Sequence, residues 1–465
     1  MRSFNLQHLA AITDGQLIGN PDLTVLGVCT DTRSVTPGDL FCAIIGENTD
    51  PHDLVYEAFD RGAVAVLASR PIDGPCVVVS SDSDLDPVIV ALGQLARVQR
   101  ETMSDATVIG ITGSSGKTST KDVIGQVVSH FAPTQAPAGS PNNELGLPLT
   151  ILQAPALTKY LVLEMGMRGL GHISYLCDIA RPTIGVVTNV GKAHIGEVGS
   201  LDAIREAKAE LVMHLPASGT AVLNYDDPYV RTMRELTPAQ VVTFGFTSEA
   251  DVFAHDLVIE SDGTSSFTVV YRDNQARVSL PLIGKHSVSN ALAAAAVGLS
   301  IGMPLDQIGQ HLHTVTAVSK WRMEVHQVAR DITLINDAYN ANPDSMRAAL
   351  LALQSMGHSR RTWAVLGAMR ELGADSDSEH IALGQSTRDF GCDVVVAVGP
   401  DAKHIYEGAR DAGVEKAVWL PDIASASDYI VSEVAPHDII LFKASRSIGL
   451  EKLVQLVEDR LGEDA

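Results

Sequence analysis

The sequence contains little cysteine, and its few cysteines form no recognisable pair. Five are scattered along the 465 residues, and none of them stands in a C-x-x-C spacing. Closely spaced pairs are typical of zinc sites and redox motifs, and an even framework is typical of small secreted folds. The sequence therefore disfavours these classes, and we expect free thiols in a reducing cytosol.

Basic residues and long apolar runs are also scarce. The chain has 34 Lys and Arg against 56 Asp and Glu, a net charge of −22, which disfavours a general nucleic-acid surface. Anionic small molecules remain possible ligands, because a few local cations and backbone N–H groups can hold them. No apolar run reaches the roughly 20 residues of a membrane span, and the first residues lack a signal-peptide pattern. We expect a cytoplasmic protein that is not inserted in a membrane.

What the chain does contain is an alternation of apolar runs and helical segments, which predicts an α/β fold in several domains. Residues 1–102 hold short strand-like runs and end in an amphipathic helix. Residues 103–317 are typical of a parallel sheet covered by helices, and the alternating pattern of 251–283 predicts an antiparallel addition at its edge. Residues 318–465 predict a second α/β unit with a parallel sheet.

The stretch VIGITGSSGKTSTK, residues 108–121, predicts a phosphate-binding loop. An apolar strand leads into small residues whose N–H groups can all point inward, and the next helix adds its positive end. Lys117 supplies a mobile cation, and the Thr118 hydroxyl can ligate Mg²⁺. The match to the usual pattern is partial, because Ile111 stands where a glycine is expected. A plain Gly/Ser turn between strand and helix is the alternative.

Two further residues follow apolar runs that are expected to end at the same edge of the sheet. Glu164 closes the run LVLE, and a carboxylate at that edge can hold Mg²⁺. His194 follows the next strand within VTNVGKAHIGEVGS, a Gly/Asn-rich setting. Each residue alone is also compatible with an ordinary surface position.

Lys208 occupies an unexpected place in the predicted helix LDAIREAKAELVMHL. Ser200 is a plausible N-cap, and the apolar stripe puts Lys208 between Ile204 and Leu211 on the face that should be buried. Snorkelling or pairing with an acid such as Glu164 would explain it. Burial could instead keep the amine neutral and nucleophilic.

Two polar clusters are compatible with either a site or simple turn chemistry. GKHSVSNALAAA places His286 and Asn290 one helical turn apart. LINDAYNANPDSM places Asp337, Asn340 and Asn342 just after a strand, where Asn and Asp are also ordinary turn formers.

Taken together, the motifs resemble the Mur ligase family over nearly the whole chain. Individually several are weak, but their order and spacing are specific: TDTRSVTPGDLF, TGSSGKTSTK, SPNNELGLPLT, LEMGMRGLGHI, TNVGKAHIGEVGS, AKAEL, GKHSVSNALAA, WRMEV, NDAYNANPDSM, LGAMRELGADSDSEH and FKASRS. NDAYNANPDSM and LGAMRELG are most similar to the member of the family that adds D-alanyl-D-alanine.

The resemblance implies three domains and an ATP-dependent amide ligase. Residues 1–102 would bind the uridine nucleotide, 103–317 would bind ATP, and 318–465 would form a Rossmann-like ligase domain. ATP would phosphorylate the terminal carboxylate of UDP-N-acetylmuramoyl-tripeptide, and the amine of D-alanyl-D-alanine would capture the acyl phosphate. The implied enzyme contributes to peptidoglycan synthesis. The sequence does not give the oligomeric state, and we expect a monomer.

The resemblance also assigns residues to the nucleotide and the metal ions. Catalytic roles fall on Lys117, Glu164, His194 and Lys208. Two Mg²⁺ ions are implied, one at Thr118 and Glu164 and a second that includes His194, with Lys208 carbamylated by CO₂. The implied ATP-binding residues are Gly113, Ser114, Ser115, Gly116, Lys117, Thr118, Ser119, Asn290, Arg322, Asp337 and Asn340.

The implied substrate contacts are Asp31, Thr32, Arg33, Asn142, Asn143, Lys443, Ser445 and Arg446. The first three fall in the uridine-diphosphate region, and the last three lie near the incoming dipeptide. The chain departs from the family pattern at Pro51, Gly196 and Ala368, where glycine, glutamate and aspartate are usual. None of these departures removes a proposed catalytic group.

Four rival functions remain open at this point. A sibling ligase or a folylpolyglutamate-type synthetase would add a different amino acid. A P-loop kinase or ATPase would turn over ATP without an amine acceptor. A nucleotide-gated binding protein would perform no chemistry, although it would be expected to lose some of the proposed catalytic residues.

Overall fold

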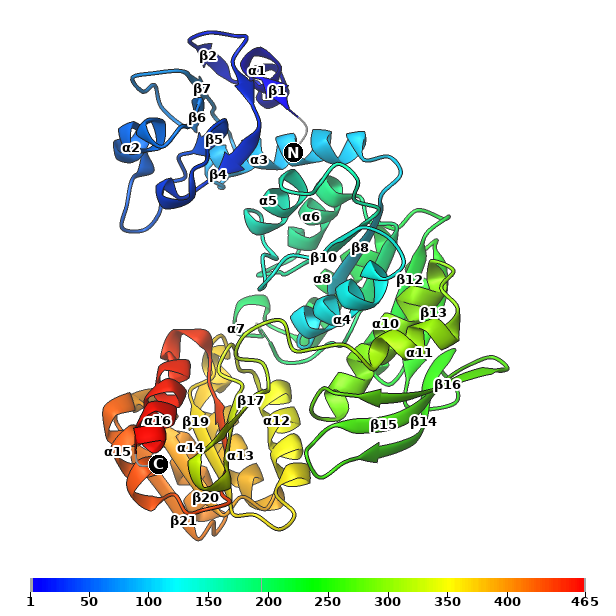
Figure 1. The fold of residues 1–465 in the computed structure, drawn as a ribbon, viewed down its shortest axis with the longest axis vertical. Helices are drawn as coiled ribbons and strands as arrows, with labels where there is room; N and C mark the ends of the chain where they lie inside the picture. The colour runs from blue at the N-terminus through cyan, green and yellow to red at the C-terminus, as the bar shows by residue number, and fades with distance from the viewer. Residues whose placement is uncertain (1–2, 194, 464–465) are drawn as a thin grey trace.

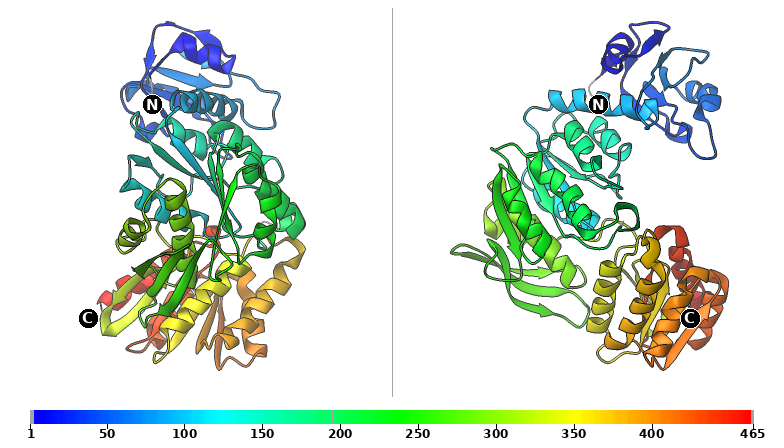
Figure 2. Two further views of the ribbon diagram at one scale, coloured as in Figure 1. Left: turned by 90° about the vertical axis from the view of Figure 1, so that its right-hand side faces the viewer. Right: turned by 180° about the vertical axis from the view of Figure 1, so that it is seen from behind.

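The computed structural model describes residues 3–193 and 195–463, so His194, a predicted metal ligand, lies outside the described residues. Three sheet-containing bodies follow one another from the N-terminus to the C-terminus (Figure 1). Seen from behind, they form an open crescent, with the middle body between the other two (Figure 2). This is the α/β, three-domain class that the sequence predicts. The boundaries at 102/103 and 317/318 stay predictions, although each large sheet falls within one of these ranges.

The first body contains a mostly parallel five-stranded sheet. Its order is β2 (Gln16–Ile18), β7 (Cys76–Val78), β6 (Ala65–Ala68), β5 (Asp39–Cys42) and β4 (Gly27–Cys29), with β2 antiparallel to β7. A short pair, β1 (Phe4–Asn5) with β3 (Thr24–Val25), and helices α1 (Leu6–Thr13) and α2 (Val55–Asp60) complete it. The long helix α3 (Pro87–Thr102) begins at the N-cap Asp86 and leads into the middle body.

The middle body is built on a nine-stranded sheet. Its parallel part runs in the order β13 (Gln240–Gly245), β12 (Thr220–Asn224), β11 (Ile184–Val187), β8 (Thr107–Thr112), β10 (Tyr160–Glu164), β9 (Thr134–Gln135). The remaining strands are β14 (Val252–Ile259), β15 (Ser265–Tyr271) and β16 (Asn274–Leu280). β15 runs antiparallel to both of its neighbours, so the predicted antiparallel addition is confirmed.

Eight helices accompany the described strands of this body. They are α4 (Lys117–Ser129), α5 (Gly146–Leu152), α6 (His172–Ala180), α7 (Ile195–Val198), α8 (Leu201–Met213), α9 (Pro228–Thr232), α10 (Lys285–Ser300) and α11 (Leu305–Leu312). Strand β8 lies between β10 and β11, so the chain leaves it at the centre of the sheet. Ligands of open parallel sheets bind beyond the carboxyl ends of such strands.

The third body repeats the parallel α/β plan. Its sheet order is β17 (Glu324–Val328), β18 (Ile332–Asn336), β22 (Ile439–Lys443), β19 (Thr362–Gly367), β20 (Val394–Val398) and β21 (Lys416–Leu420), and only β17 is antiparallel. The helices are α12 (Pro343–Met356), α13 (Ser376–Asp389), α14 (Lys403–Asp411), α15 (Ile423–Glu433) and α16 (Leu450–Glu463). Asn342 caps α12 in a reciprocal capping box with Ser345, which explains why NPDS opens a helix.

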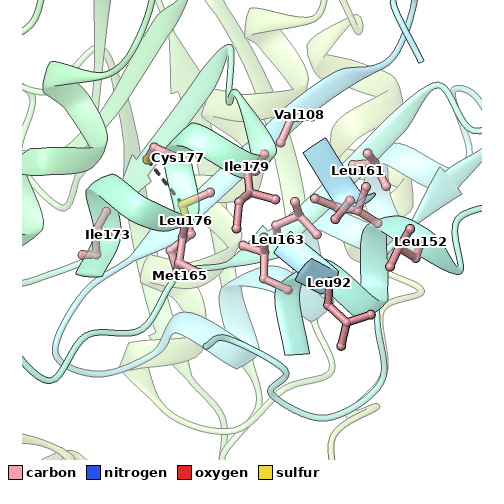
Figure 3. Packing of buried hydrophobic residues seen from close by; sticks show 14 of the residues in the cluster. Leu92, Val108, Leu152, Leu161, Leu163, Met165, Ile173, Leu176, Cys177 and Ile179 are labelled. Carbon is pink, nitrogen blue, oxygen red and sulfur yellow. Dashed lines mark hydrogen bonds between the residues drawn. The ribbon is translucent and has the colours of Figure 1, made fainter. Parts of the chain in front are cut away.

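The hydrophobic core of the middle body extends to the helix that arrives from the first body. Leu92 of α3 packs in one buried cluster with Leu161 and Leu163 of β10 and with Ile179 of α6 (Figure 3). The strands contribute leucine and valine on both faces, as expected for a sheet covered by helices. The first body is therefore attached through apolar packing. No helix of the part described is long and apolar enough to cross a membrane.

Candidate active site

The loop between β8 and α4 has the geometry of an anion cradle. Gly116 caps α4 with φ of 76°, a left-handed conformation that favours glycine. The Lys117 Nζ donates to the Gly113 carbonyl oxygen at 2.7 Å, so the side chain folds across the loop. The N–H groups that open α4 lack acceptors within the helix and carry its positive end. A phosphate placed here would meet both the backbone donors and the lysine.

Residues after β11 fix the shape of this loop. Asn189 accepts from the Ser115 N–H at 2.8 Å and donates to the Ser115 Oγ at 2.9 Å. The Ser114 N–H reaches the Asn189 carbonyl at 3.0 Å, and the Thr188 hydroxyl donates to the Ser115 carbonyl at 2.8 Å. The expectation that the loop's N–H groups all point inward is therefore wrong for Ser114 and Ser115. Both of these N–H groups donate to Asn189, which follows the neighbouring strand β11. Sequence reasoning missed Thr188 and Asn189, although they stand in the same motif as His194.

A buried carboxylate lies beside the first turn of α4. Glu164 is 1% exposed and pairs across the sheet with Ile111 of β8, one residue before that strand ends. Its Oε2 accepts from the Thr118 hydroxyl at 2.7 Å. Its Oε1 accepts from the Ser140 hydroxyl at 2.8 Å and from the Asn142 amide at 2.7 Å. The structure thus brings together Thr118, Glu164 and Asn142, which come from three separate motifs.

The donor set around Glu164 suits a hard divalent cation. A hydroxyl and a carboxylate are oxygen ligands, and Mg²⁺ commonly binds one or two protein oxygens and completes its shell with water and substrate phosphates. Across residues 3–193 and 195–463, no three His, Cys, Asp or Glu side chains are grouped to hold a metal by themselves. The site therefore fits an ion that arrives with a phosphate ligand.

Lys208 lies on the buried face of α8, as the spacing predicts. It is 1% exposed, and the helix is capped by Ser200, whose side chain accepts from the Ala203 N–H at 3.1 Å. Within the described residues its amine forms no hydrogen bond or ion pair, so pairing with Glu164 is not found there. Burial, reinforced by the nearby charge of Lys117, holds the pKa of Lys208 well below its ordinary value. The neutral amine is the nucleophilic form.

A cavity of about 610 Å³ opens between the middle and third bodies. That size suits a nucleotide-sized ligand. Every residue predicted to bind ATP except Gly113 lines it, together with Glu164, Asn142 and Lys443. Burial lowers the pKa of Lys117, an effect that Glu164 opposes and Arg322 reinforces.

The cavity is lined by both apolar and charged side chains. Val123, Leu282 and Val318 are among the apolar lining residues, and such surfaces suit a flat heterocycle. Asn290 reaches the cavity with its Oδ1 fixed by the Thr120 hydroxyl at 2.9 Å. His286 also lines the cavity, and burial lowers its pKa.

The third body contributes an ion pair to the cavity. Asp337 follows β18 and Lys443 ends β22, and the Lys443 Nζ lies 2.6 Å from the Asp337 Oδ2. The same Nζ donates to the Asn340 carbonyl at 2.9 Å. Lys443, expected near the dipeptide, thus lies in the cavity with the residues predicted for ATP.

Asn142, also predicted to contact substrate, lines this cavity, whereas Asn143, Ser445 and Arg446 do not. The Ser445 hydroxyl accepts from the Arg370 N–H at 2.9 Å, and Arg446 pairs with Glu451 at 2.6 Å. Asn143 accepts from the Gly146 N–H at 2.8 Å and supports the start of α5.

The residues predicted for the uridine nucleotide lie in the first body, apart from this cavity. The Asp31 side chain accepts from the Arg33 N–H at 2.9 Å and pairs with the Arg33 guanidinium at 2.6 Å. Thr32 is buried at the start of the same 3-10 turn. This pairing lowers the pKa of Asp31 to about 2.

The three departures from the family pattern have simple local settings. Pro51 is the first residue of a 3-10 helix capped by Asp50, a position that accepts proline. Ala368 is buried, and its carbonyl accepts from the Ser445 N–H at 3.0 Å. At Gly196, a Cβ would lie 2.4 Å from the Gly373 nitrogen of the third body. A glutamate has no room there in this arrangement.

Comparison with known proteins places this site in a family. Residues 111–298 match the Mur ligase middle domain, and residues 321–446 match the Mur ligase, glutamate ligase domain. A UDP-N-acetylmuramoyl-tripeptide–D-alanyl-D-alanine ligase of Mycobacterium bovis is 41% identical over 456 residues, covering 90% of this chain and 89% of that protein. The chain belongs to the Mur ligase family.

Further Mur ligases extend the similarity over the full length. The Escherichia coli enzyme with the same name is 35% identical and covers 99% of both chains. A crystal structure of MurF from Acinetobacter baumannii has a TM-score of 0.90 at 32% identity, covering 99% of each chain. MurF ligase from Thermotoga maritima, solved in complex with ADP, has a TM-score of 0.81 at 29% identity, covering 94% of this chain and 98% of that one.

Proposed function

We propose that this Mur ligase joins D-alanyl-D-alanine to UDP-N-acetylmuramoyl-tripeptide, using ATP, and so completes the pentapeptide precursor of peptidoglycan. The observation that carries the proposal is the cavity in which the Lys117 loop and the Thr118–Glu164 pair face Asp337 and Lys443 of the third body. Full-length relatives named for this reaction support the choice of substrates.

The reaction proceeds in two steps, and water must be excluded from the site during both. The substrate carboxylate attacks the γ-phosphorus of ATP, the bond to the β-phosphate oxygen breaks, and ADP is the leaving group. The neutral amine of the dipeptide then attacks the acyl carbon, an amide bond forms, phosphate leaves and the amine loses a proton. Lys117 and the N–H groups at the start of α4 stabilise the charge on the transferring phosphoryl group.

The proposed nucleotide contacts divide between the two bodies. Asn290 contacts the adenine, and Asp337 contacts the ribose. Arg322 and Asn340 approach from the third body's side and close the cavity over the phosphates. Such closure excludes water, which would otherwise hydrolyse the acyl phosphate.

We also propose two Mg²⁺ sites and a modified lysine. Thr118 and Glu164 hold one ion, and His194 with a carbamylated Lys208 holds the second. Bound Mg²⁺ neutralises charge on the phosphoryl group and the acyl oxygen. Support for the carbamate is the low pKa of Lys208 and the lack of a partner for its amine among the described residues, because CO₂ adds only to a neutral amine.

The lysine proposal predicts chemical rescue. Lys208→Ala should lower kcat by about a hundredfold or more, on the scale of losing one charge that supports a transition state. Short carboxylic acids should restore part of the activity by supplying the missing carboxylate. Leu211→Ala on the same face of α8 is the matched control, and it should show no rescue by acid. An active Lys208→Ala enzyme would refute the carbamate.

The substrate proposal is tested by a coupled phosphate-release assay. With UDP-N-acetylmuramoyl-tripeptide and ATP, release should depend on D-alanyl-D-alanine and should fail with single amino acids. Release with a single amino acid instead would identify a sibling ligase or a folylpolyglutamate-type synthetase. ATP turnover without any acceptor would identify a kinase or ATPase. We further propose a cytoplasmic monomer, which sedimentation of the purified protein tests for its oligomeric state.

A further inference from the structure

The segment between α11 and β17 carries a cation into the nucleotide cavity. Arg322 lies in this linker, and its Nη2 donates to the Thr118 Oγ1 at 2.8 Å. The hydroxyl proton of Thr118 is already directed at the Glu164 Oε2, 2.7 Å away. The guanidinium therefore faces the lone pairs of the same oxygen that is proposed to bind Mg²⁺.

A metal ion and this arginine compete for one side of Thr118. A hydroxyl has one proton and two lone pairs, and a ligated cation must lie on the lone-pair side. Mg²⁺ binds its oxygens at about 2 Å with strict octahedral geometry, which leaves little room for a second cation on that oxygen. Two positive charges in a partly buried site also repel each other strongly.

Arg322 is held in this position by its neighbours on the linker and by one ring. Its guanidinium lies 4.2 Å from the centre of the Tyr339 ring, a favourable cation–π contact. The Tyr339 N–H donates to the Trp321 carbonyl at 3.1 Å. Both Trp321 and Met323 have left-handed φ, 60° and 51°. Strained residues of this kind often mark segments that change conformation.

Arg322 has donor capacity that this arrangement leaves unused. Its Nε is buried and has no hydrogen-bond partner among the described residues. An unsatisfied buried donor costs stability, and a phosphate oxygen in the cavity would satisfy it. The start of the linker is fixed independently, because the Gln126 side chain of α4 bonds to both the N–H and the carbonyl of Thr316, at 2.9 and 3.0 Å.

We propose that Arg322 is a built-in substitute for the divalent cation. In the nucleotide-free protein its guanidinium occupies the metal side of Thr118 and keeps free metal out. When a metal–nucleotide complex binds, the linker residues 321–323 move and Arg322 transfers its hydrogen bonds to the phosphates. The inference rests on the proposed nucleotide-binding role of the cavity, and it adds an order of events: metal enters with the nucleotide.

The test measures metal binding to the nucleotide-free protein, with Mn²⁺ as the probe and electron paramagnetic resonance as the readout. Arg322→Gln should tighten Mn²⁺ binding by about five- to tenfold, because it removes the competing charge. Arg347→Gln is the matched control, since Arg347 carries the same charge on α12 and stacks instead on Phe390. Its Mn²⁺ affinity should equal that of the unmodified protein.

Two further variants keep the test decisive. Tyr339→Leu removes the supporting ring and should tighten Mn²⁺ binding by a smaller factor, about twofold. Adding Glu164→Gln to Arg322→Gln should abolish the gain, since the gain is assigned to the Thr118–Glu164 site. A gain that survives in the double variant, or no gain in Arg322→Gln, overturns the proposal.

Nucleotide affinity distinguishes the proposed exchange between Arg322 and the metal from a structural defect in the variant. It also distinguishes failure of this proposal from failure of the proposed function. Arg322→Gln should weaken binding of ADP in the presence of a metal chelator, while it strengthens binding of Mn²⁺ alone. A structural defect would weaken both. Arg322→Gln could change the affinities for Mn²⁺ and ADP in these opposite directions while the unmodified protein releases no phosphate with D-alanyl-D-alanine. In that case the substrate assignment fails, and the proposed role of Arg322 is retained.

Discussion

The two walls of the nucleotide cavity are built in different ways. The wall in the middle body includes a run of neighbouring residues, 114–119, fixed by hydrogen bonds from the exit of one adjacent strand. The wall in the third body combines the linker residue Arg322 with Asp337 and Lys443, which lie 106 positions apart. The loop proposed to bind phosphate is therefore formed by neighbouring residues and fixed within the middle body. The opposite wall depends on residues far apart in the sequence and on the position of the third body.

If this contrast is right, the largest loss should come from the wall in the middle body. Lys117→Ala removes the cation that folds over the loop, and kcat should fall by about a thousandfold, since a preorganised charge at a phosphoryl group carries much of the catalysis. Phosphate release under saturating substrates measures it. Lys121→Ala is not a suitable control, because Lys121 is buried against Asp122; the exposed Lys285 on α10 is a better one. Near-normal turnover of Lys117→Ala would refute the assigned role.

A smaller effect is expected at the carboxylate behind the loop. Glu164→Gln keeps the size of the side chain but removes its charge, so the Mg²⁺ concentration for half-maximal activity should rise about tenfold or more. A metal titration at saturating ATP measures this shift. Ser140→Ala, which removes only one hydrogen bond to the same carboxylate, should shift the titration much less. An unchanged curve for Glu164→Gln would argue against metal ligation.

A substitution at Gly196, which contacts Gly373 of the third body, tests whether activity depends on the arrangement of the two bodies. A methyl group at 196 would collide with the backbone of the third body, where the Gly196 N–H now bonds to the Glu371 carbonyl at 3.1 Å. Gly196→Ala should lower kcat about tenfold by hindering closure, as measured by phosphate release. Gly199→Ala, with open space around its Cβ, serves as a comparison, although its positive φ adds local strain. Gly196 itself has no left-handed φ, so an unchanged kcat in Gly196→Ala would argue against a role for the contact.

The smallest effect should come from the ion pair between the same two bodies. The Lys192 Nζ lies 2.5 Å from the Glu379 Oε1, and the pair is partly exposed. Lys192→Met should change kcat/KM by about twofold and mostly at low salt, because exposed pairs contribute little and are screened. Kinetics at two ionic strengths check this. A larger, salt-independent loss would assign Lys192 a direct part in the reaction.

The same contrast explains how much of the molecule could be predicted from the sequence. The phosphate loop, the capped helix α8 and the antiparallel edge strands come from local patterns, and the structure places them as expected. Glu164 could be assigned to the sheet edge because strand periodicity fixes where an apolar run ends. Even the burial of Lys208 follows from a single helical repeat.

The remaining features depend on contacts between distant residues. Nothing local to Asn189 indicates that it takes the Ser115 N–H, and nothing local to Lys443 indicates its pairing with Asp337. The close approach of the glycines at 196 and 373 requires the relative position of two domains. Such contacts are set by packing over long sequence separations, which periodicity does not report.

The bond between Gln126 and Thr316 gives α4 a second attachment. Gln126 lies nine residues after Lys117, roughly 14 Å along the helix axis. Its side-chain amide bonds to the backbone of Thr316, in the linker that leads to the third body. A displacement of the linker at Thr316 would therefore act on the same helix whose N-terminus is proposed to bind the phosphates. A substitution at Gln126 would therefore uncouple movement of the third body from the start of α4 without changing any residue of the proposed nucleotide site.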